Sequence, residues 1–383
     1  MIKVAVITAP NRSNTGMVSV DLAAESFFND KAVAFDLYRT HTVDNKDIEK
    51  FSGQQFYRLK DPGQLKDYDV ICYWGDFLNS PAYGQEDFFG LDQRDGICRD
   101  REESFKRWMR LCLLDGYDKG CQRVISVSNN FQGMASSLSR MGTEERSSVC
   151  RLLEHNFDAI FPRDPVSTEM LVKHCPRAAK GNIRTGVDAA FLLDSHSFVP
   201  DDGRTWSARS FSYFFGRSGI TGLSQLLLSL GLHFRAFPSE LEGWLSVTPE
   251  REGWEQLSAF LCQVSRSQFV VTDTYHLCVN AMNLGVPVVG VGRYSDEQEG
   301  TLGDYKKQTL FQMFGQKENY IAIQKPRLSS EDRRSVRQAV RRLLSSSNGA
   351  VSASSRIRAR VQAYKAELEA SLFGGHVSGV ACQ

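Results

Sequence analysis

The stretch FVVTDTYHLCVNAMNLGVPVVGVG, residues 269–292, decides the fold of the C-terminal half of the chain. It opens with an apolar β-branched run, continues through a polar segment at 272–276, and then shows apolar residues near helical spacing. Gly285 ends that pattern and a second apolar run follows at 288–291. This order predicts a strand, a loop, a helix and a second strand of a buried parallel sheet. Because such sheets bind ligands beyond the carboxyl ends of their strands, we expect the chemistry in the polar segment.

His276 is the candidate for proton transfer in that segment. An acid, two hydroxyls and a phenol precede it directly, at Thr272, Asp273, Thr274 and Tyr275. Imidazole is the side chain whose ordinary pKa lies closest to neutral pH. A histidine that opens a helix can also serve only as a hydrogen-bond donor to a neighbouring loop, and the sequence leaves this structural alternative open.

Length and composition narrow the class of protein. A chain of 383 residues suits two domains of ordinary size. With 46 basic and 45 acidic residues, the formal net charge of +1 provides no general attraction for nucleic acid or for an anionic membrane. The nine cysteines contain no C-x-x-C pair, so neither a disulfide framework nor a zinc site is predicted. The chain starts with a strand-like run and has no apolar stretch of about 18 residues, so we expect a cytoplasmic protein with at most peripheral membrane contact.

The N-terminal half also alternates strand-like and helix-like patterns. Residues 2–7 predict the first strand, and the following loop at 8–17 is rich in small polar residues. A strand, such a loop and a helix form a corner that can accept a phosphate or a sugar, and Asn14, Thr15 and Gly16 are its candidate residues. The loop lacks the glycine patterns of dinucleotide and P-loop sites.

Three further strand-like runs in this half end in polar residues. Gly75 and Asp76 follow the first, Asn130 the second, and Arg163 the third. An ion pair between Arg163 and Asp164 that only fixes the loop is the structural alternative for the last of these. We also expect a polar helix over 44–51, and a substrate loop or a surface excursion over 81–101, where no periodicity is visible.

A polar linker at 195–208 separates the halves, and a new strand at 211–215 leads into a small-residue corner before a helix at 220–230. The corner contains Gly216, Arg217, Ser218, Gly219 and Thr221. We expect it to hold an anion, although an exposed arginine in a plain turn is an equal alternative. The whole pattern predicts an α/β protein with two Rossmann-like domains facing a cleft, residues 1–200 and 201–345, followed by a helix and tail at 346–383.

Spaced blocks over about residues 1–315 resemble the polysaccharide pyruvyl transferase family. The blocks are Asn14-Thr15-Gly16, residues 69–75, residues 163–167, residues 188–191 and residues 273–291. In the same order they resemble the family's Gly/Asn loop, its Asp-apolar-Gly-Gly strand end, its Arg-Asp-x-x-Ser and Asp-x-x-Phe blocks, and its Ser-Arg-x-His segment followed by a helix, Gly-x-Pro and a strand. His276 takes the position of the family histidine, whereas Thr274 stands where the family has an arginine.

This resemblance implies a glycosyltransferase-B-like fold and transfer of a pyruvyl group from phosphoenolpyruvate to a sugar of a glycan or glycolipid precursor. His276, Arg163 and Asp273 are then the catalytic candidates, with Asp164 as a second candidate to orient the histidine. The donor would contact Arg217, Ser218, Gly219, Thr221 and Thr274 in the second domain. The acceptor would contact Asn14, Thr15, Gly16, Gly75, Asp76 and Asn130 in the first. The resemblance requires no metal and no cofactor, and the sequence predicts no oligomeric state.

Two other functions fit the same architecture. A glycosyltransferase could use the corner at 216–221 for the diphosphate of a nucleotide sugar, and Thr274 in place of the arginine favours it. A non-catalytic sugar-binding relative would keep the fold without the donor site.

Overall fold

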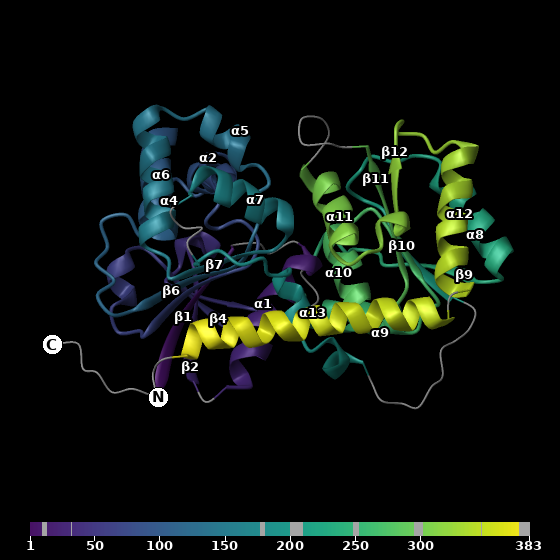
Figure 1. Ribbon diagram of the computed structural model, residues 1–383, viewed down its shortest axis with the longest axis horizontal. Helices are drawn as coiled ribbons and strands as arrows, with labels where there is room; N and C mark the ends of the chain where they lie inside the picture. The colour runs from purple at the N-terminus through teal and green to yellow at the C-terminus, as the bar shows by residue number, and fades with distance from the viewer. Residues whose placement is uncertain are drawn as a thin grey trace. The chain divides into compact units, whose positions relative to one another are not determined.

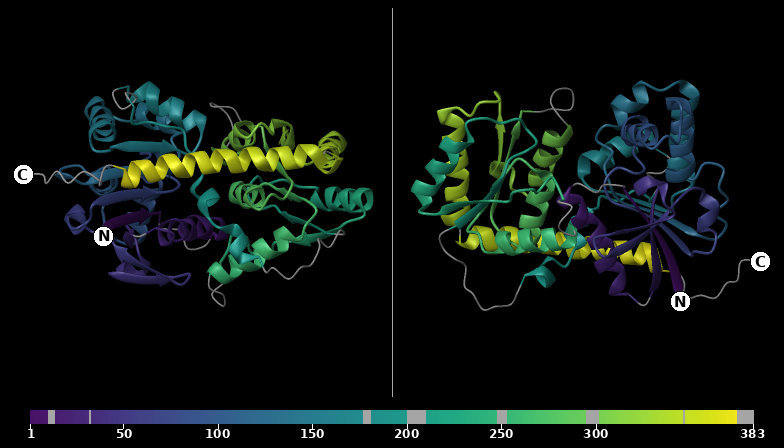
Figure 2. Two further views of the ribbon diagram at one scale, coloured as in Figure 1. Left: turned by 60° about the horizontal axis from the view of Figure 1, so that its bottom comes forward. Right: turned by 180° about the vertical axis from the view of Figure 1, so that it is seen from behind.

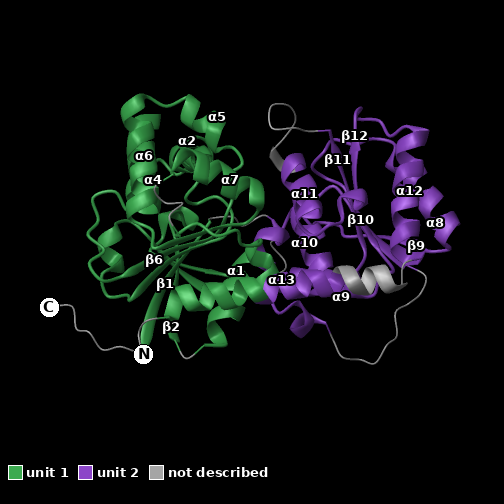
Figure 3. Cartoon of the chain, in the orientation of Figure 1, with its two compact units in different colours: residues 1–11, 20–192, 363–383 green, residues 12–19, 193–362 purple. Residues whose placement is uncertain are grey.

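The computed structural model describes residues 1–9, 14–31, 33–176, 181–199, 210–247, 253–294, 302–345 and 347–374. The chain forms two compact units (Figures 1 to 3). Unit 1 contains residues 1–11, 20–192 and 363–383, and unit 2 contains residues 12–19 and 193–362. Among the described residues, no helix has both the length and the apolar character to cross a bilayer.

Unit 1 is built on a seven-stranded sheet with the strand order β3-β4-β2-β1-β5-β6-β7. The strands are β1 (Ile2–Thr8), β2 (Val33–Arg39), β3 (Ile48–Phe51), β4 (Gln54–Arg58), β5 (Val70–Trp74), β6 (Arg123–Asn129) and β7 (Ala159–Pro162). All neighbours are parallel except β3 and β4, which form a hairpin. The central strand β5 is buried along its whole length, as expected for a strand covered on both faces.

The helices of unit 1 follow its strands in the alternation that the sequence predicts. They are α1 (Thr15–Asn29), whose first turn belongs to unit 2, α2 (Pro81–Gln85), α3 (Asp87–Arg94), α4 (Arg101–Cys112), α5 (Met134–Ser139), α6 (Thr143–His155) and α7 (Pro165–His174). Short 3-10 turns lie at η1 (Val43–Asn45), η2 (Pro62–Leu65) and η3 (Ala189–Leu192). Phe27 and Phe28 of α1 pack against Trp74 with ring centroids 5.5 and 5.7 Å apart, which fixes α1 on the sheet.

Unit 2 contains a five-stranded sheet in the order β12-β11-β10-β8-β9, and all its strand pairs are parallel. The strands are β8 (Ser210–Phe214), β9 (Phe237–Glu240), β10 (Val270–Thr272), β11 (Val288–Arg293) and β12 (Tyr320–Ile323). The helices are α8 (Leu223–Phe234), α9 (Gly253–Ser265), α10 (Tyr275–Asn283), α11 (Leu302–Met313) and α12 (Ser330–Ser345), and a 3-10 turn lies at η4 (Ser195–Phe198) and another at η5 (Lys317–Asn319). Helices α8 and α12 cover one face of the sheet and α10 and α11 the other (Figure 1).

The prediction for residues 269–292 is confirmed. They form β10, α10 and β11, and the two strands are direct parallel neighbours with Val270 opposite Val288. Val271 and Val289 face a core made with Leu226 and Val340 of the helices α8 and α12. Two other predictions are wrong. Strand β3 lies within the segment 44–51 that was predicted as a helix, and α2 and α3 occupy most of the segment 81–101 that was predicted as a loop or surface excursion.

The two units divide the chain differently from the predicted ranges. Residues 12–19 join unit 2, where the Thr15 amide donates to the Trp244 carbonyl at 3.1 Å. The predicted C-terminal helix is present as α13 (Ser347–Phe373), and its residues up to 362 belong to unit 2 and those from 363 to unit 1. In unit 1, Tyr364 contacts Ser128 with 3.2 Å between the hydroxyl oxygens. The predicted boundary near residue 200 lies outside the described residues, and unit 1 runs to Leu192.

Candidate functional site

The polar segment between β10 and α10 lies at the carboxyl end of the unit 2 sheet, where the sequence predicted it. The Thr272 hydroxyl donates to the Phe214 carbonyl at 2.7 Å and accepts from the Thr274 amide at 3.0 Å. His276 follows in the first turn of α10 and is 5% exposed. Its ring meets the Tyr275 ring edge-on, with 5.2 Å between the centroids. The segment therefore holds the imidazole in a fixed position at the start of a helix.

The loop before α1 lies directly against His276 within unit 2. A Cβ atom at Gly16 would stand 2.5 Å from the His276 Cβ, so only glycine permits this approach. The Gly16 amide donates to the Asn14 side chain at 2.9 Å, and Gln256 donates to the Thr15 hydroxyl at 3.2 Å. The structure thus brings Asn14, Thr15 and Gly16 together with His276. They belong to unit 2, whereas the sequence had assigned them to the first domain.

The connection between this loop and α10 is also polar. Asn280 donates to the Ser19 hydroxyl at 3.1 Å and to the His276 carbonyl at 2.8 Å. Ser19 in turn donates to the Gly16 carbonyl at 2.6 Å. A buried chain of hydrogen bonds therefore fixes the start of α1 and the start of α10 against each other.

The predicted anion corner after β8 is occupied by a carboxylate of the protein itself. Asp273, 1% exposed, accepts hydrogen bonds from the backbone amides of Gly216, Arg217 and Ser218 at 2.9, 2.8 and 2.7 Å. It also accepts from the Thr274 hydroxyl at 3.3 Å. These contacts indicate that Asp273 anchors the loop after β8, a different role from the predicted orientation of His276. A donor anion at this corner must be bound by side chains and not by these three amides.

The rest of that corner also departs from the prediction. Helix α8 begins at Leu223 with Gly222 as its cap, so Thr221 lies before the helix. The Thr221 amide donates to the Pro326 carbonyl at 2.8 Å, because this residue bridges to the segment before α12. Gly219 has a φ of 59°, in the left-handed region, and is exposed like Arg217. Arg217 is therefore accessible to an anionic ligand, while Thr221 serves the fold.

Sequence reasoning assigned no role to Lys307, which is 1% exposed at the same end of the sheet. Its ammonium group lies 2.7 Å from the Asp304 carboxylate and donates to the Ser218 hydroxyl and the Val291 carbonyl, each at 3.3 Å. It also donates to the Asp273 carbonyl. Lys307 therefore connects the carboxyl ends of β10 and β11 to the loop after β8.

Lys306 is the second residue that the sequence analysis missed. Its ammonium nitrogen lies 5.1 Å from the centroid of the Tyr275 ring, next to the start of α10. Unlike Lys307 it is partly exposed. The sequence feature that could have indicated both residues is a pair of lysines in a helix that follows a strand of a parallel sheet, because ligands bind at that end of such sheets.

Arg163 is fully buried in unit 1 and is surrounded by acids. Its guanidinium lies 3.0 Å from Asp76 and 3.7 Å from each of Asp164 and Asp188. The carboxylate of Asp164 also caps α7 by accepting from the Ser167 amide at 2.7 Å. Arg163 therefore joins the loops at the carboxyl ends of β5 and β7, and its predicted catalytic role stays a prediction. Within unit 1, Asp164 serves as the cap of α7.

The other residues predicted on the acceptor side lie beside Arg163. Asn130 donates its amide N–H to the Asp76 carbonyl at 2.6 Å, and its side chain accepts from the Ser167 hydroxyl at 3.1 Å. Gly75 has a φ of 78°, and a Cβ there would stand 2.5 Å from a methyl group of Val20. Gly75, Asp76, Asn130 and Arg163 thus form one polar cluster at the carboxyl edge of the unit 1 sheet.

A second polar cluster of unit 1 was not predicted. Arg39, at the end of β2, is fully buried, lies 2.6 Å from Asp21 and 3.3 Å from Glu49, and stacks on Phe56. Burial raises the pKa of Asp21 to about 6, although the neighbouring Arg39 opposes this shift. Thr8, the register partner of Arg39 on β1, is buried next to Asp21, and its hydroxyl also lowers the pKa of that carboxyl. An acid with a pKa near neutrality thus lies at the carboxyl ends of two parallel strands.

The residues just after Arg39 continue this cluster. His41 lies 2.8 Å from Asp92, which also accepts from Ser104 at 2.7 Å and pairs with Arg107. Burial lowers the pKa of His41, so its imidazole is neutral at neutral pH. The sequence signal was the polar run at 39–42 directly after an apolar strand. The hydrogen bonds within this group indicate a structural role that ties the loop after β2 to α3 and α4.

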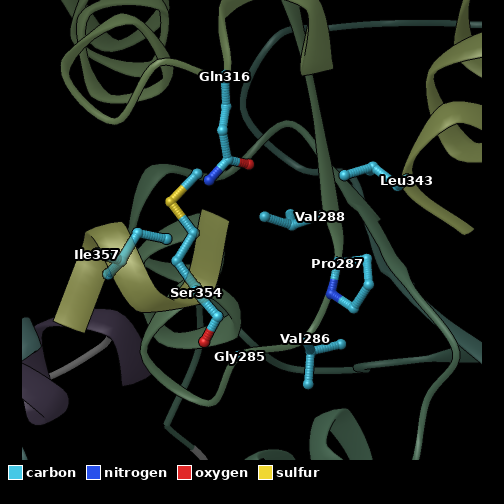
Figure 4. A pocket seen from close by; sticks show the side chains of 9 residues that line it. Gly285, Val286, Pro287, Val288, Gln316, Leu343, Ser354 and Ile357 are labelled. Atoms are coloured by element: carbon cyan, nitrogen blue, oxygen red, sulfur yellow. The ribbon is translucent and has the colours of Figure 1, made fainter. Parts of the chain in front are cut away.

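A small cavity lies at the opposite end of the unit 2 sheet (Figure 4). Its volume is about 30 Å³, and its walls are mostly apolar, with Pro287 and Val288 at the start of β11 and Ile357 of α13. Gln316 and Ser354 add polar groups. The cavity holds no more than a few water molecules and lies away from His276. Within the described ranges, no three His, Cys, Asp or Glu side chains are grouped as metal ligands.

Comparison with known proteins agrees with the predicted resemblance. Residues 132–295 match the model of the polysaccharide pyruvyl transferase family. This confirms the predicted resemblance to that family over the matched residues. The matched segment contains both the 163–167 block and His276. A comparison with curated proteins gives no match.

Several solved structures share the fold at low sequence identity. S. aureus MnaA, solved with UDP, has a TM-score of 0.53 at 10% identity, with 98% of each chain covered. The UDP-GlcNAc 2-epimerase from Neisseria meningitidis bound to UDP-GlcNAc has a TM-score of 0.51 at 10% identity, with 97% of this chain and 99% of that chain covered. A putative UDP-N-acetylglucosamine 2-epimerase from Listeria monocytogenes has the same TM-score of 0.51 at 10% identity, with 96% and 95% covered. These likenesses confirm the predicted α/β fold of glycosyltransferase-B type with two Rossmann-like units.

Proposed function

We propose that the chain transfers a pyruvyl group from phosphoenolpyruvate to two hydroxyls of a sugar in a glycan or glycolipid precursor, in the cytoplasm and without a cofactor. The observation that carries this proposal is the family match over residues 132–295, which includes the imidazole of His276 at the carboxyl end of the unit 2 sheet.

The proposed reaction is balanced by acid–base chemistry alone. Two sugar hydroxyl oxygens bond to C2 of phosphoenolpyruvate, and the bond from C2 to the phosphate oxygen breaks. Of the two protons that the hydroxyls lose, one goes to the methylene carbon and the other leaves with inorganic phosphate. A group near neutral pKa must move these protons, and cations must hold the carboxylate and phosphate of the donor. His276 is our candidate for the first task.

Lys306 and Arg217 are our candidates for the second task. Both lie in unit 2: Arg217 is exposed in the loop that Asp273 holds, and Lys306 is partly exposed in α11 beside Tyr275. Lys306 directly precedes Lys307, whose ammonium group donates to the Asp273 carbonyl. We infer that the charge of Lys306 compensates for Thr274, which stands where the family has an arginine.

Donor binding tests this proposal before any acceptor is identified. The purified full-length protein would be titrated with phosphoenolpyruvate in a thermal unfolding assay, with pyruvate and inorganic phosphate as controls. A ligand at 100 times its dissociation constant stabilises the folded state by about 2.7 kcal/mol, which shifts the unfolding midpoint measurably. Absence of a shift with phosphoenolpyruvate at concentrations up to several millimolar would contradict the proposal.

A glycosyltransferase that uses a nucleotide sugar is the second candidate, and Thr274 favours it because the family arginine is missing. Two of the structures with the same fold hold UDP or UDP-GlcNAc. The same unfolding assay with UDP-GlcNAc and UDP-glucose separates the candidates. Stabilisation by a nucleotide sugar and not by phosphoenolpyruvate would support this second candidate.

A further inference from the structure

The edge of the unit 1 sheet presents a row of side chains with no part in the proposed reaction, from buried Tyr38 through partly exposed Tyr57 to exposed Ile48. Tyr38 of β2 lies opposite Tyr57 of β4, and Tyr57 lies opposite Ile48 of β3. Because side chains alternate along a strand, these three share one face of the sheet. Their neighbours Leu37 and Phe56 lie on the other face and are buried. Ile48 is 49% exposed, so the edge of this face is open to solvent.

Three tyrosine rings form a fixed surface there. The ring centroids of Tyr38 and Tyr57 are 5.7 Å apart, and those of Tyr38 and Tyr68 are 5.9 Å apart in an edge-on arrangement. The hydroxyls of Tyr38 and Tyr68 lie 2.9 Å apart, and Tyr68 donates to Asp36 at 2.7 Å. Gln55 donates to the Tyr57 hydroxyl at 2.7 Å. The rings are therefore oriented before any ligand arrives, which reduces the entropy cost of binding.

Two cavities lie beside Tyr57, which lines both. The first has a volume of about 260 Å³, and the second about 210 Å³. Besides Tyr57, the first is lined by Tyr38, Asp47, Ile48, Arg58, Lys60 and Gln64. The second is lined by polar Glu25, Asp36, Gln54 and Gln55 and by apolar residues of β2. We call the two cavities and the three tyrosines the tyrosine groove.

The chemistry of the tyrosine groove determines which ligand suits it. The first cavity is lined by the cations Arg58 and Lys60 and by Asp47, which pairs with Lys60, and the second by two carboxylates and two amides. Over both cavities the carboxylates outnumber the cations, so the tyrosine groove as a whole has no excess of positive charge for a nucleic acid. The carboxylates accept hydrogen bonds, the ammonium group of Lys60 donates them, and the amides do both. Together they match the hydroxyls of a neutral polyol, which donate and accept. A sugar ring also has an apolar C–H face that packs on a tyrosine ring.

We propose that the tyrosine groove binds a neutral oligosaccharide, with consecutive sugar units in the two cavities and one of them packed on Tyr57. The site is distinct from the residues around His276 in unit 2. It is independent of the donor, so it stands whether or not pyruvyl transfer is the reaction.

Binding of defined glycans to the full-length protein tests this proposal. Maltohexaose, cellohexaose, laminarihexaose and chitohexaose would be titrated by isothermal calorimetry without phosphoenolpyruvate. We expect at least one to bind, Tyr57→Ala to weaken that binding at least about tenfold, and Tyr57→Phe to stay within about threefold because it keeps the ring. Lys60→Ala and Gln64→Ala, both at exposed positions, should weaken glycan binding as well. They test the tyrosine groove if Tyr57→Ala does not fold.

Tyr117→Ala is the matched control. Tyr117 is also a partly exposed residue of unit 1, and its hydroxyl donates to a glutamine side chain, that of Gln122, at 2.6 Å. Glycan binding should be unchanged in this variant. It should also be unchanged in His276→Ala, so that the glycan assay tests the tyrosine groove independently of the pyruvyl-transfer proposal. The proposal is overturned if none of the four glycans binds at about 10 mM, or if Tyr57→Ala binds as tightly as the wild type, or if Tyr117→Ala loses binding equally.

Discussion

Replacement of Asp273 distinguishes an anchoring role from a catalytic one. The carboxylate accepts three backbone N–H bonds, two at Oδ2 from Arg217 and Ser218 and one at Oδ1 from Gly216. Hydrogen bonds to a charged group contribute about 1.5–3 kcal/mol each, but three on one group do not add fully. For Asp273→Ala we expect a loss of about 3–5 kcal/mol, because three backbone amides, among them that of buried Ser218, lose a charged acceptor. This is a large part of the 5–15 kcal/mol that typical domains have.

Asp273→Asn is therefore the informative variant. If its carbonyl oxygen takes the place of Oδ2, the bonds from Arg217 and Ser218 remain, while its NH₂ group faces the Gly216 amide and cannot accept from it. The bond from the Gly216 amide and the negative charge are lost, while the Thr274 hydroxyl at 3.3 Å can turn to accept from the new NH₂ group, so we expect a decrease of about 2 kcal/mol in the free energy of unfolding. Urea titration, monitored by the fluorescence of buried Trp244 in the same unit, measures this difference.

The control is Asp332→Asn, whose carboxylate accepts from the Ser329 amide at 2.8 Å at the exposed start of α12. There we expect a loss of less than about 1 kcal/mol, because solvent can replace the bond. If Asp273→Asn unfolds at the wild-type urea concentration but loses turnover, our assignment of Asp273 as an anchor is wrong and a role beside His276 is restored.

Three further predictions concern charge and proton transfer. His276→Ala should keep its fold and lower turnover by about 10²–10⁴-fold, measured as phosphate release from phosphoenolpyruvate with an acceptor; near-normal turnover would exclude His276 from the chemistry. Lys306→Ala should weaken phosphoenolpyruvate binding about tenfold in calorimetry while Lys306→Arg restores most of it, and equal affinity in all three proteins would contradict a role in donor binding. The raised pKa of Asp21, about 6 against 3.8, means that the folded state binds the proton more tightly, so this stabilisation is present below pH 3.8 and is lost as pH rises through 6. Between pH 4 and 6 the unfolding free energy of the wild type should fall by about 2 kcal/mol relative to Asp21→Asn, and parallel pH profiles would contradict the shift.

The sequence predicted well where hydrophobic pattern and stop signals agree. Residues 269–292 combine β-branched runs with Gly285 at the helix end, where φ is 74°, and the predicted strand, helix and strand formed. The hairpin of β3 and β4 was missed because its turn, Ser52 and Gly53 with φ of 53° and 77°, was not recognised as a two-residue hairpin loop. Without that turn, the polar residues before it looked helical.

The site was predicted less completely, because residue type does not reveal which partner a charge will find. Glycines and hydroxyls at 216–221 indicated a site for an anion, and the structure supplies one from Asp273, 52 residues or more away along the chain. Arg163 looked available for a substrate, but Asp76 and Asp188 reach it from other loops. Such pairings depend on which strands become neighbours, and no local pattern encodes them.

The exposure of the cations in each unit indicates which of them can bind the donor. In unit 1, Arg163 lies among three carboxylates and Arg39 between two, so neither has excess positive charge for phosphoenolpyruvate. In unit 2, Lys307 is buried beside Asp304, whereas Arg217 in the loop after β8 is exposed and Lys306 in α11 is partly exposed. A donor with a carboxylate and a phosphate requires accessible cations, because desolvated charge must be compensated. Donor binding should therefore depend on unit 2, so that Arg217→Ala combined with Lys306→Ala abolishes it, whereas Arg107→Ala, a partly exposed cation of unit 1, leaves it unchanged.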